Sequence, residues 1–455
     1  MTADNPAIAP QTDAPTDAPA DDLLAKIRAQ FDRAPYPRIP LDTLPPPSKL
    51  YYHSVQTAFY RRDQRVVDPA GMAILDVGCG SGFGTMALAI ANPGATVVGA
   101  DLSPASVDLA QKRLGHHGLG DRAEFVTLSL EELAQLGRQF DYINCDELLY
   151  LQPDPAASLA AMGAVLKPHG IIRANLHSRH QRSEYFKAQQ IASMLGLLDD
   201  NPGEFEVEAF SDLFDALRDD CRLKARTWNK DNRQQEEKMM MNFLFQGDRG
   251  FTVPDLFEML GGAGLEFVSM TNWQGWNLLE LFKDQEELPA FLAMGLEMAE
   301  EADKLALYEL LHFEHRLIDF WCSHPDAGDR AWTPVEEWEP EDWEATVVHL
   351  HPQLQTDEFR QALEAAVLDG KNLNMNDHLS LPWGLATVSS AMAGLLAPLF
   401  SGSKSFEEMV AAGRRSRPVD PVTLDPMGPD QAMAPLRYLL REFVKAGYVF
   451  VEPMA

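Results

Sequence analysis

The stretch ILDVGCGSGFGTMALA, from Ile74 to Ala89, decides the fold of this chain of 455 residues. Met72 to Val77 is almost entirely apolar, as expected of a strand that is buried on both faces of a parallel sheet. Four glycines follow at positions 78, 80, 82 and 84, and the residues from Thr85 to Ala91 suit a helix. The glycines therefore occupy a strand–loop–helix turn, which is where a parallel sheet holds its ligand.

The spacing of these glycines distinguishes between the classes of ligand that such a loop can bind. A P-loop requires GxxxxGK[ST], and no lysine follows the glycines. A dinucleotide loop requires GxGxxG, and neither Gly78 nor Gly80 begins that register, which disfavours a nicotinamide dehydrogenase. Asp76 stands two residues before the first glycine, and its carboxylate would repel a pyrophosphate but suits a ligand with a positive end. A tight turn without any ligand is the remaining alternative.

LDVGCGSG resembles the first motif of the class I S-adenosylmethionine-dependent methyltransferases. The resemblance implies a Rossmann-like α/β domain in which the loop passes under the methionine part of the cofactor, where Gly78, Gly80 and Gly82 let the backbone approach closely. ATVVGAD then ends at Asp101, and an acid at the end of the second strand can accept hydrogen bonds from both ribose hydroxyls.

The later strands continue the resemblance over residues 70–178. AEFVTLSLEEL matches the third strand and its exit, where family members often carry an aspartate that meets the adenine amino group; Ser129 stands there and can accept that hydrogen bond without charge. FDYINCDELLYLQPDP and VLKPHGIIRANLHS resemble the fourth and fifth strand motifs. The cofactor residues that the resemblance implies are Asp76, Gly78, Cys79, Gly80, Gly82, Asp101, Leu102, Ser129, Leu130 and Cys145.

Methyl transfer is an in-line displacement that mainly requires alignment, so few catalytic residues are needed. His177 leaves the fifth strand and could be a general base, or a structural histidine. Asp146 and the adjacent Glu147 follow the fourth strand and could hold a cationic amine, or face solvent. Tyr52, with Tyr51, precedes the first strand by about one helix and could cover the methyl group, or simply pack.

No metal is predicted. His312 and His315, like His349 and His351, lack a third ligand at the spacing of a known metal motif. The four cysteines are scattered without a CxxC, which fits a reducing cytoplasm.

The organisation of the chain follows from composition and periodicity. Residues 1–21 are rich in Pro, Ala, Thr and Asp and predict a disordered tail without the features of a signal peptide. The methyltransferase domain is expected over residues 22–278, with a helical insertion at about 180–248 that often forms a lid in this family. The last elements of this domain are expected to be a helix that begins at Pro254 and ends at Gly264, and a strand from Leu265 to Met270.

Residues 279–455 are expected to form a mostly helical C-terminal domain that ends in a winged-helix-like module. This extension, with FLFQGDRGFTVPDLFEMLGGAGLEFV and the upstream PYPRIPL, resembles bacterial methyltransferases that carry a C-terminal regulatory domain. Some of those are linked to protein lysine methylation.

The net charge of −30 is uneven along the chain. Residues 1–200 carry 17 basic and 23 acidic side chains, whereas the remainder carries 21 and 45. The acidic second half argues against nucleic acid or an anionic membrane as a partner. The expected activity is methyl transfer to a small molecule or a protein side chain; the alternative is a non-catalytic protein that binds S-adenosylmethionine as a scaffold. The sequence assigns neither the acceptor nor an oligomeric state.

Overall fold

The structure is a computed structural model that describes residues 20–33, 35–229, 231–285, 287–328, 332–416, 418–419 and 425–454. The expected tail therefore lies outside the described residues, except that helix α1 (Ala20–Arg33) already begins at Ala20.

A seven-stranded sheet forms the centre of the molecule, with the strand order β3-β2-β1-β4-β5-β7-β6. The first five strands are parallel, and β7 runs antiparallel to both of its neighbours. The sheet thus has the parallel α/β character that the apolar strands predicted. The strands are β1 (Ala73–Val77), β2 (Thr96–Asp101), β3 (Ala123–Thr127), β4 (Phe140–Cys145), β5 (Leu166–His177), β6 (Glu266–Met270) and β7 (Leu317–Ser323).

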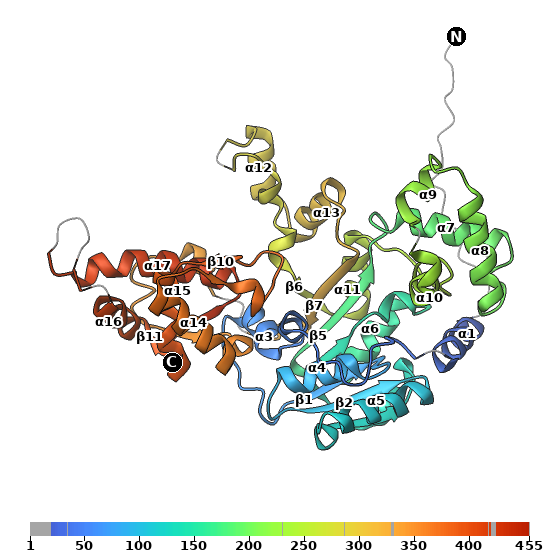
Figure 1. Cartoon of the computed structure of the whole chain (residues 1–455), viewed down its shortest axis with the longest axis horizontal. Helices are drawn as coiled ribbons and strands as arrows, with labels where there is room; N and C mark the ends of the chain where they lie inside the picture. Colours follow the sequence, from blue (N-terminus) through green and yellow to red (C-terminus); the bar gives the residue numbers. More distant parts are fainter. Residues whose placement is uncertain are drawn as a thin grey trace, which may run out of the picture.

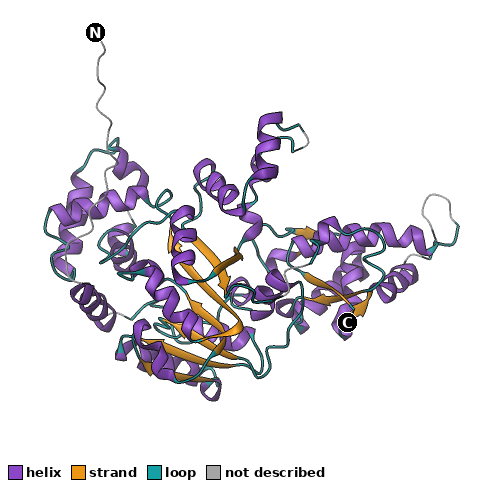
Figure 2. Cartoon of the chain, turned by 180° about the vertical axis from the view of Figure 1, so that it is seen from behind, coloured by secondary structure: helices purple, strands orange, loops and turns teal. Residues whose placement is uncertain are grey.

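Helices cover both faces of this sheet (Figures 1 and 2). One face packs against α6, α11 and α13, and the other against α3 and α4, with α5 beside α4. Pro at the first turn of α5, α6 and α11 fixes where these helices begin, because its missing N–H has no partner there anyway. The helices are α3 (Val55–Asp63), α4 (Phe83–Ala91), α5 (Pro104–His116), α6 (Pro155–Ala164), α11 (Val253–Ala263) and α13 (Glu301–Leu311).

The expected insertion after β5 is present and helical. It has its own small core of Phe210, Phe214, Phe243 and neighbouring apolar side chains. It lies at the side of the sheet away from the C-terminal helices (Figure 1). Its helices are α7 (Ser183–Met194), α8 (Glu204–Ala216), α9 (Arg222–Thr227) and α10 (Glu236–Asn242).

The expected domain boundary at residue 278 is wrong. The sheet is completed by β7, which lies beyond that boundary and is inserted between β5 and β6. Helices α12 (Ala290–Met298) and α13 connect β6 to β7, and the strand LIDFWCS lies within the region after residue 279 that was expected to be mostly helical. Phe320 and Trp321 pack on opposite faces of the sheet, so β7 belongs to the main core.

A separate C-terminal unit follows residue 332. Its core is distinct from that of the sheet and surrounds a small antiparallel sheet of order β11-β8-β12. The chain ends with α15, α16, α17 and β12 in that order, and the winged-helix likeness of this end stays a prediction. Its elements are β8 (Thr346–Leu350), α14 (Asp357–Asp369), β9 (Leu373–Asn374), β10 (Thr387–Val388), α15 (Ser390–Leu396), β11 (Lys404–Ser405), α16 (Phe406–Ser416), α17 (Pro429–Lys445) and β12 (Val449–Pro453).

Within the described ranges, the helices are all too short or too polar to cross a membrane.

Candidate active site

A cavity of about 380 Å³ opens at the carboxyl ends of β1, β2 and β4. The glycine loop and the residues that follow β2 and β4 form its walls, and α1 covers it with Leu24, Ile27 and Phe31. This volume lies within the range of about 300–1,000 Å³ that is usual for small-molecule sites. The predicted residues that line it are Asp76, Gly78, Cys79, Gly80, Asp101, Leu102, Ser129, Leu130 and Asp146.

The glycine loop is held from two sides. The backbone N–H of Gly80 donates to Asp101 Oδ2 at 2.8 Å, and the N–H of Ser81 donates to the carbonyl oxygen of Tyr36 at 2.9 Å. A Cβ atom on Gly80 would lie 2.3 Å from that same carbonyl oxygen. Only glycine therefore fits between the loop and the Tyr36 segment.

Two predicted cofactor residues lie elsewhere. Gly82 is the N-cap residue before α4, and a Cβ there would lie 2.7 Å from the Cα of Ala110 in α5, so this glycine allows the two helices to pack closely. Cys145 is fully buried in the core, because side chains alternate along β4 and its neighbour Asn144 takes the cavity side.

Asp76 and Asp101 are both withdrawn from water. Asp76 accepts hydrogen bonds from Thr85 Oγ1 at 2.6 Å and from Asn144 Nδ2 at 2.7 Å, and burial raises its pKa to about 6. Burial also raises the pKa of Asp101, against the effect of the backbone N–H groups of Ser103 and Gly80. A positively charged ligand end beside Asp76 would restore the charged form of this carboxyl.

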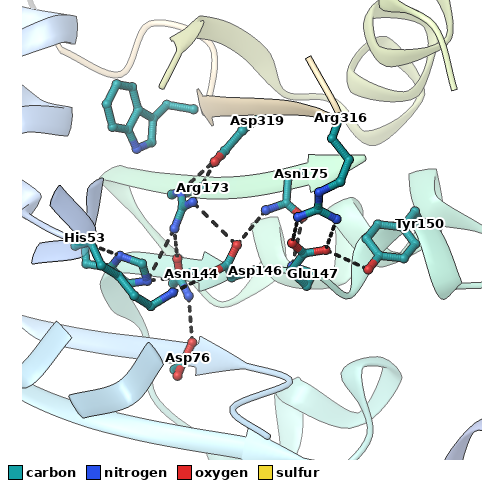
Figure 3. A network of polar contacts seen from close by, with 12 residues as sticks. His53, Asp76, Asn144, Asp146, Glu147, Tyr150, Arg173, Asn175, Arg316 and Asp319 are labelled. Atoms are coloured by element: carbon teal, nitrogen blue, oxygen red, sulfur yellow. Dashed lines mark hydrogen bonds and ion pairs between the residues drawn. The ribbon is translucent and has the colours of Figure 1, made fainter. Parts of the chain in front are cut away.

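A buried polar network links the floor of the cavity to β7 (Figure 3). Arg173 of β5 donates to Asn144 Oδ1 at 3.1 Å and makes two hydrogen bonds with Asp319, at 3.0 and 2.6 Å. It also lies 3.5 Å from Asp146, which accepts from Asn175 Nδ2 at 2.7 Å. Burial alone would raise the pKa of Asp146, but Arg173 and its other partners hold that pKa well below its usual range. Asp146 is therefore ionised at neutral pH.

Glu147 occupies a strained position at the mouth of the same cavity. Its backbone φ is +59°, a left-handed conformation that costs a non-glycine residue energy and that occurs at functional sites. The conformation is held by the backbone N–H, which donates to Asn175 Oδ1 at 2.9 Å, and by the side chain, which accepts from Tyr150 at 2.8 Å and pairs with Arg316. Figure 3 shows Tyr150 and Arg316 meeting at the Glu147 carboxylate.

The other two predicted catalytic residues do not reach the cavity. His177 is 2 % exposed, stacks on Tyr150, and has Nδ1 at 2.6 Å from Asp248 and Nε2 at 3.0 Å from Arg316. Burial lowers the pKa of His177, which favours the neutral imidazole. Both ring nitrogens already have a polar partner in the protein. Tyr52 lies edge-on to Trp383 of the C-terminal unit.

Several side chains of the site were not predicted. Tyr36 and Lys49 reach the cavity from segments before the first strand, and nothing in their spacing marks them. Arg173 and Asn175 did carry a signal: with His177 they alternate with apolar residues in the second half of β5, which puts the three on one face.

The sequence comparisons agree with this geometry. A family model described as a methyltransferase domain matches residues 68–244. A ubiquinone biosynthesis O-methyltransferase of Hahella chejuensis is 31 % identical over 175 residues, 37 % of this chain and 71 % of that protein. An uncharacterised protein of Synechococcus sp. is 28 % identical over 300 residues, 65 % of this chain and 71 % of that protein. Three further ubiquinone biosynthesis O-methyltransferases are matched over only 48, 58 and 52 % of their own lengths.

Among solved structures, PKMT2 from Rickettsia typhi in complex with AdoHcy superposes with a TM-score of 0.58 at 15 % identity. The superposition covers 92 % of this chain and 77 % of that one, so the likeness in fold extends into the C-terminal unit. The glycine loop and the strand order 3-2-1-4-5-7-6 already point to one cofactor. Together with the matched relatives, they establish that the chain belongs to the class I S-adenosylmethionine-dependent methyltransferases.

Proposed function

We propose that the cavity beneath α1 holds S-adenosylmethionine and that the acceptor reaches its methyl group beside Tyr36, Asp146 and Glu147. The observation that carries this assignment is that one cavity joins the glycine loop, Asp101 and the end of β4. In this placement Asp101 accepts from the ribose hydroxyls. Leu102, Ser129 and Leu130 surround the adenine, and Asp76 faces the ammonium group of the methionine end.

The reaction requires little covalent chemistry from the protein. The acceptor's lone pair forms a bond to the methyl carbon while the carbon–sulfur bond breaks and its electron pair returns to sulfur, which leaves the neutral thioether S-adenosylhomocysteine. The chain's residues bind and orient the two partners, and this alignment supplies much of the rate enhancement. Any proton on the acceptor nucleophile must leave to water or to a nearby group.

The protonation states of the site favour an acceptor that can attack without first losing a proton to a general base, such as a neutral amine. The low pKa of Asp146 makes its carboxylate a weak base, and burial raises the pKa of Tyr36 to about 12, so neither suits general-base catalysis near pH 7. A second cavity of about 110 Å³ shares Phe31 and Tyr36 with the first and is lined by Glu237 and Met240 from the insertion. We infer that the acceptor enters there, as a small molecule or a protein side chain.

We also infer where the protein acts and which classes of partner it does not bind. The four cysteines are unpaired, which fits a cytoplasmic location. The acidic second half of the sequence favours neither nucleic acid nor an anionic membrane surface as the partner.

Isothermal titration with S-adenosylmethionine, S-adenosylhomocysteine and NAD tests the cofactor assignment. Asp101→Ala should weaken binding of both adenosyl ligands about tenfold or more, because hydrogen bonds to a charged group contribute roughly 1.5–3 kcal/mol. Asp141→Ala is the matched control. Asp141 also accepts a backbone hydrogen bond, from Ala73 at 2.8 Å, but it lies at the amino ends of the strands, away from the cavity.

Binding of NAD alone, or unchanged affinity in folded Asp101→Ala, would contradict the assignment. Transfer of labelled methyl groups to small-molecule and protein fractions of a bacterial extract then separates an enzyme from a non-catalytic scaffold. An enzyme labels a fraction in an Asp101-dependent manner, whereas a scaffold binds the cofactor and labels neither fraction.

A further inference from the structure

Helix α2 (Pro47–Tyr52) joins the C-terminal unit to the cofactor cavity. Tyr51 is fully buried, and it belongs to the hydrophobic core of the C-terminal unit although it precedes that unit by almost 300 residues. Lys49, on the same short helix, lines the cavity. The two side chains are therefore coupled through about half a turn of rigid backbone.

The C-terminal unit leaves Tyr51 little freedom. Its ring stacks on His351, with 4.7 Å between ring centroids, and His351 Nε2 lies 2.9 Å from Thr57 Oγ1 in α3. On another side, a Cβ atom added to Gly447 would lie 2.4 Å from the Tyr51 hydroxyl. Tyr60 of α3 also exchanges hydrogen bonds with both backbone groups of Val451, at 2.9 and 3.0 Å. The position of α2 is thus set from the C-terminal side.

On the cavity side, Lys49 points its ammonium group at the end of β4. Its Nζ lies 3.4 Å from Asp146 Oδ2 and 5.8 Å from the ring centroid of Phe83, the residue after Gly82. Figure 3 shows Asp146 where the contacts from Arg173 and Asn175 meet. Since Asp146 keeps these two partners, Lys49 can turn to a ligand without leaving a buried carboxylate unpaired.

We propose that Lys49 binds the α-carboxylate of the cofactor's methionine end and that Tyr51 and His351 position it, so that the C-terminal unit sets cofactor affinity through α2. This inference rests on the proposed cofactor site. The methionine end is a zwitterion, and Asp76 accounts for its ammonium group only. Among the described residues that line the cavity, the basic ones are Lys49 and Arg28, and Arg28 lies on α1, 3.6 Å from Asp32. Lys49 is the cation beside the glycine loop.

The test is a double-mutant cycle on the full chain with S-adenosylhomocysteine as the titrated probe. Lys49→Met should weaken binding about tenfold or more, since it removes a charge-assisted contact. His351→Ala should weaken binding severalfold by releasing Tyr51, and it should add little further loss in the Lys49→Met background, because it acts through Lys49. Gly447→Ala pushes on Tyr51 from the other side and replaces His351→Ala if that variant does not fold.

Leu363→Ala is the matched control, because Leu363 is buried in the same C-terminal core, on α14. It should lower the stability of the C-terminal unit and leave the affinity unchanged. The inference is overturned if His351→Ala and Gly447→Ala bind the probe like the native chain, or if the His351 and Lys49 effects are additive, or if Leu363→Ala weakens binding as much. Failure of the native chain to bind the probe would instead overturn the proposed function.

Discussion

At the scale of single residues, the site depends on carboxylates whose charge is set by their surroundings. Asp76 and Asp146 both line the cavity, yet their pKa values move in opposite directions. Among the described residues, the hydrogen-bond donors to Asp76 are the neutral side chains of Thr85 and Asn144, so burial dominates its pKa. Asp146 lies beside the guanidinium of Arg173, and Arg173 together with Lys49, His53 and Asn175 outweighs the effect of burial on its pKa. The two groups therefore suit different tasks: Asp76 can bind a cationic ligand, whereas the charge of Asp146 is already balanced by its protein partners.

Asp76 should make cofactor affinity depend on pH. Its pKa is about 6 in the free protein, so a growing fraction is protonated below that pH, and a cationic ligand must expel the proton. Affinity for S-adenosylhomocysteine should be nearly constant above pH 7 and fall below pH 6, by up to about tenfold per pH unit. Isothermal titration between pH 5 and pH 8 measures this, with circular dichroism to confirm that the protein stays folded.

Asp76→Asn supplies the control, because it removes this titrating group and should bind more weakly with a flatter profile over the same range, where Asp101, whose pKa burial also raises, accounts for any remaining slope. A native profile as flat as that of Asp76→Asn would mean that the ammonium group lies elsewhere.

At the scale of elements, the insertion is fastened to the sheet through one buried carboxylate. Asp248 follows α10 and lies 2.6 Å from His177 Nδ1 at the end of β5. It also accepts from Arg182 and Gln189, each at 2.8 Å, the latter on α7. His177 is thus explained as an anchor of the insertion, and through Arg316 it also supports Glu147.

Asp248→Ala should destabilise the insertion strongly. The substitution leaves the buried guanidinium of Arg182 without its counter-charge, and breaking a buried pair in this way costs roughly 3–5 kcal/mol. Asp212 lies on α8, and Asp212→Ala removes an exposed pair with Arg233, which should cost about 0–1 kcal/mol. Denaturant unfolding and hydrogen exchange of α7 measure the difference. Equal losses in the two variants would show that Asp248 is not the anchor.

At the scale of the whole molecule, the sheet and the C-terminal unit are interleaved along the chain. The sheet needs β7, which follows the long β6–β7 connection, and the C-terminal core needs Tyr51, which comes before β1. Two cores therefore share segments that are distant in sequence, and cutting the chain at one point disturbs both.

A chain shortened to residues 20–278 should not fold. It lacks β7, so β5 keeps only β4 as a neighbour and β6 loses its partner in the sheet, while Phe320 and Trp321 are missing from opposite faces of the core. A chain of residues 20–328 keeps all seven strands of this sheet and should show the circular dichroism of a folded α/β protein, at lower stability. A soluble 20–278 chain that binds S-adenosylhomocysteine would contradict this topology.

The sequence by itself determined the features that depend on neighbouring residues. The order of strand, glycine loop and helix, the acid at the end of β2 and the first five strands all follow from spacing and period, because side-chain direction and backbone freedom are local properties. That information sufficed for the fold class and the cofactor, and for placing Asp76, Gly80 and Asp101 at one cavity.

Only the tertiary structure decided what depends on which segments meet. In the structure Asn144 rather than Cys145 lines the cavity, and Gly82 lies at a contact between helices. His177 is buried outside the cavity, and β7 lies between β5 and β6 in the sheet. The tertiary structure also brought Lys49 to Asp146 while Tyr51 entered a core built from residues beyond 332. Such contacts depend on how segments that are distant in the sequence pack together. The arrangement that forms is the one that best buries apolar side chains and pairs charges over the whole chain, so no local sequence pattern predicts it.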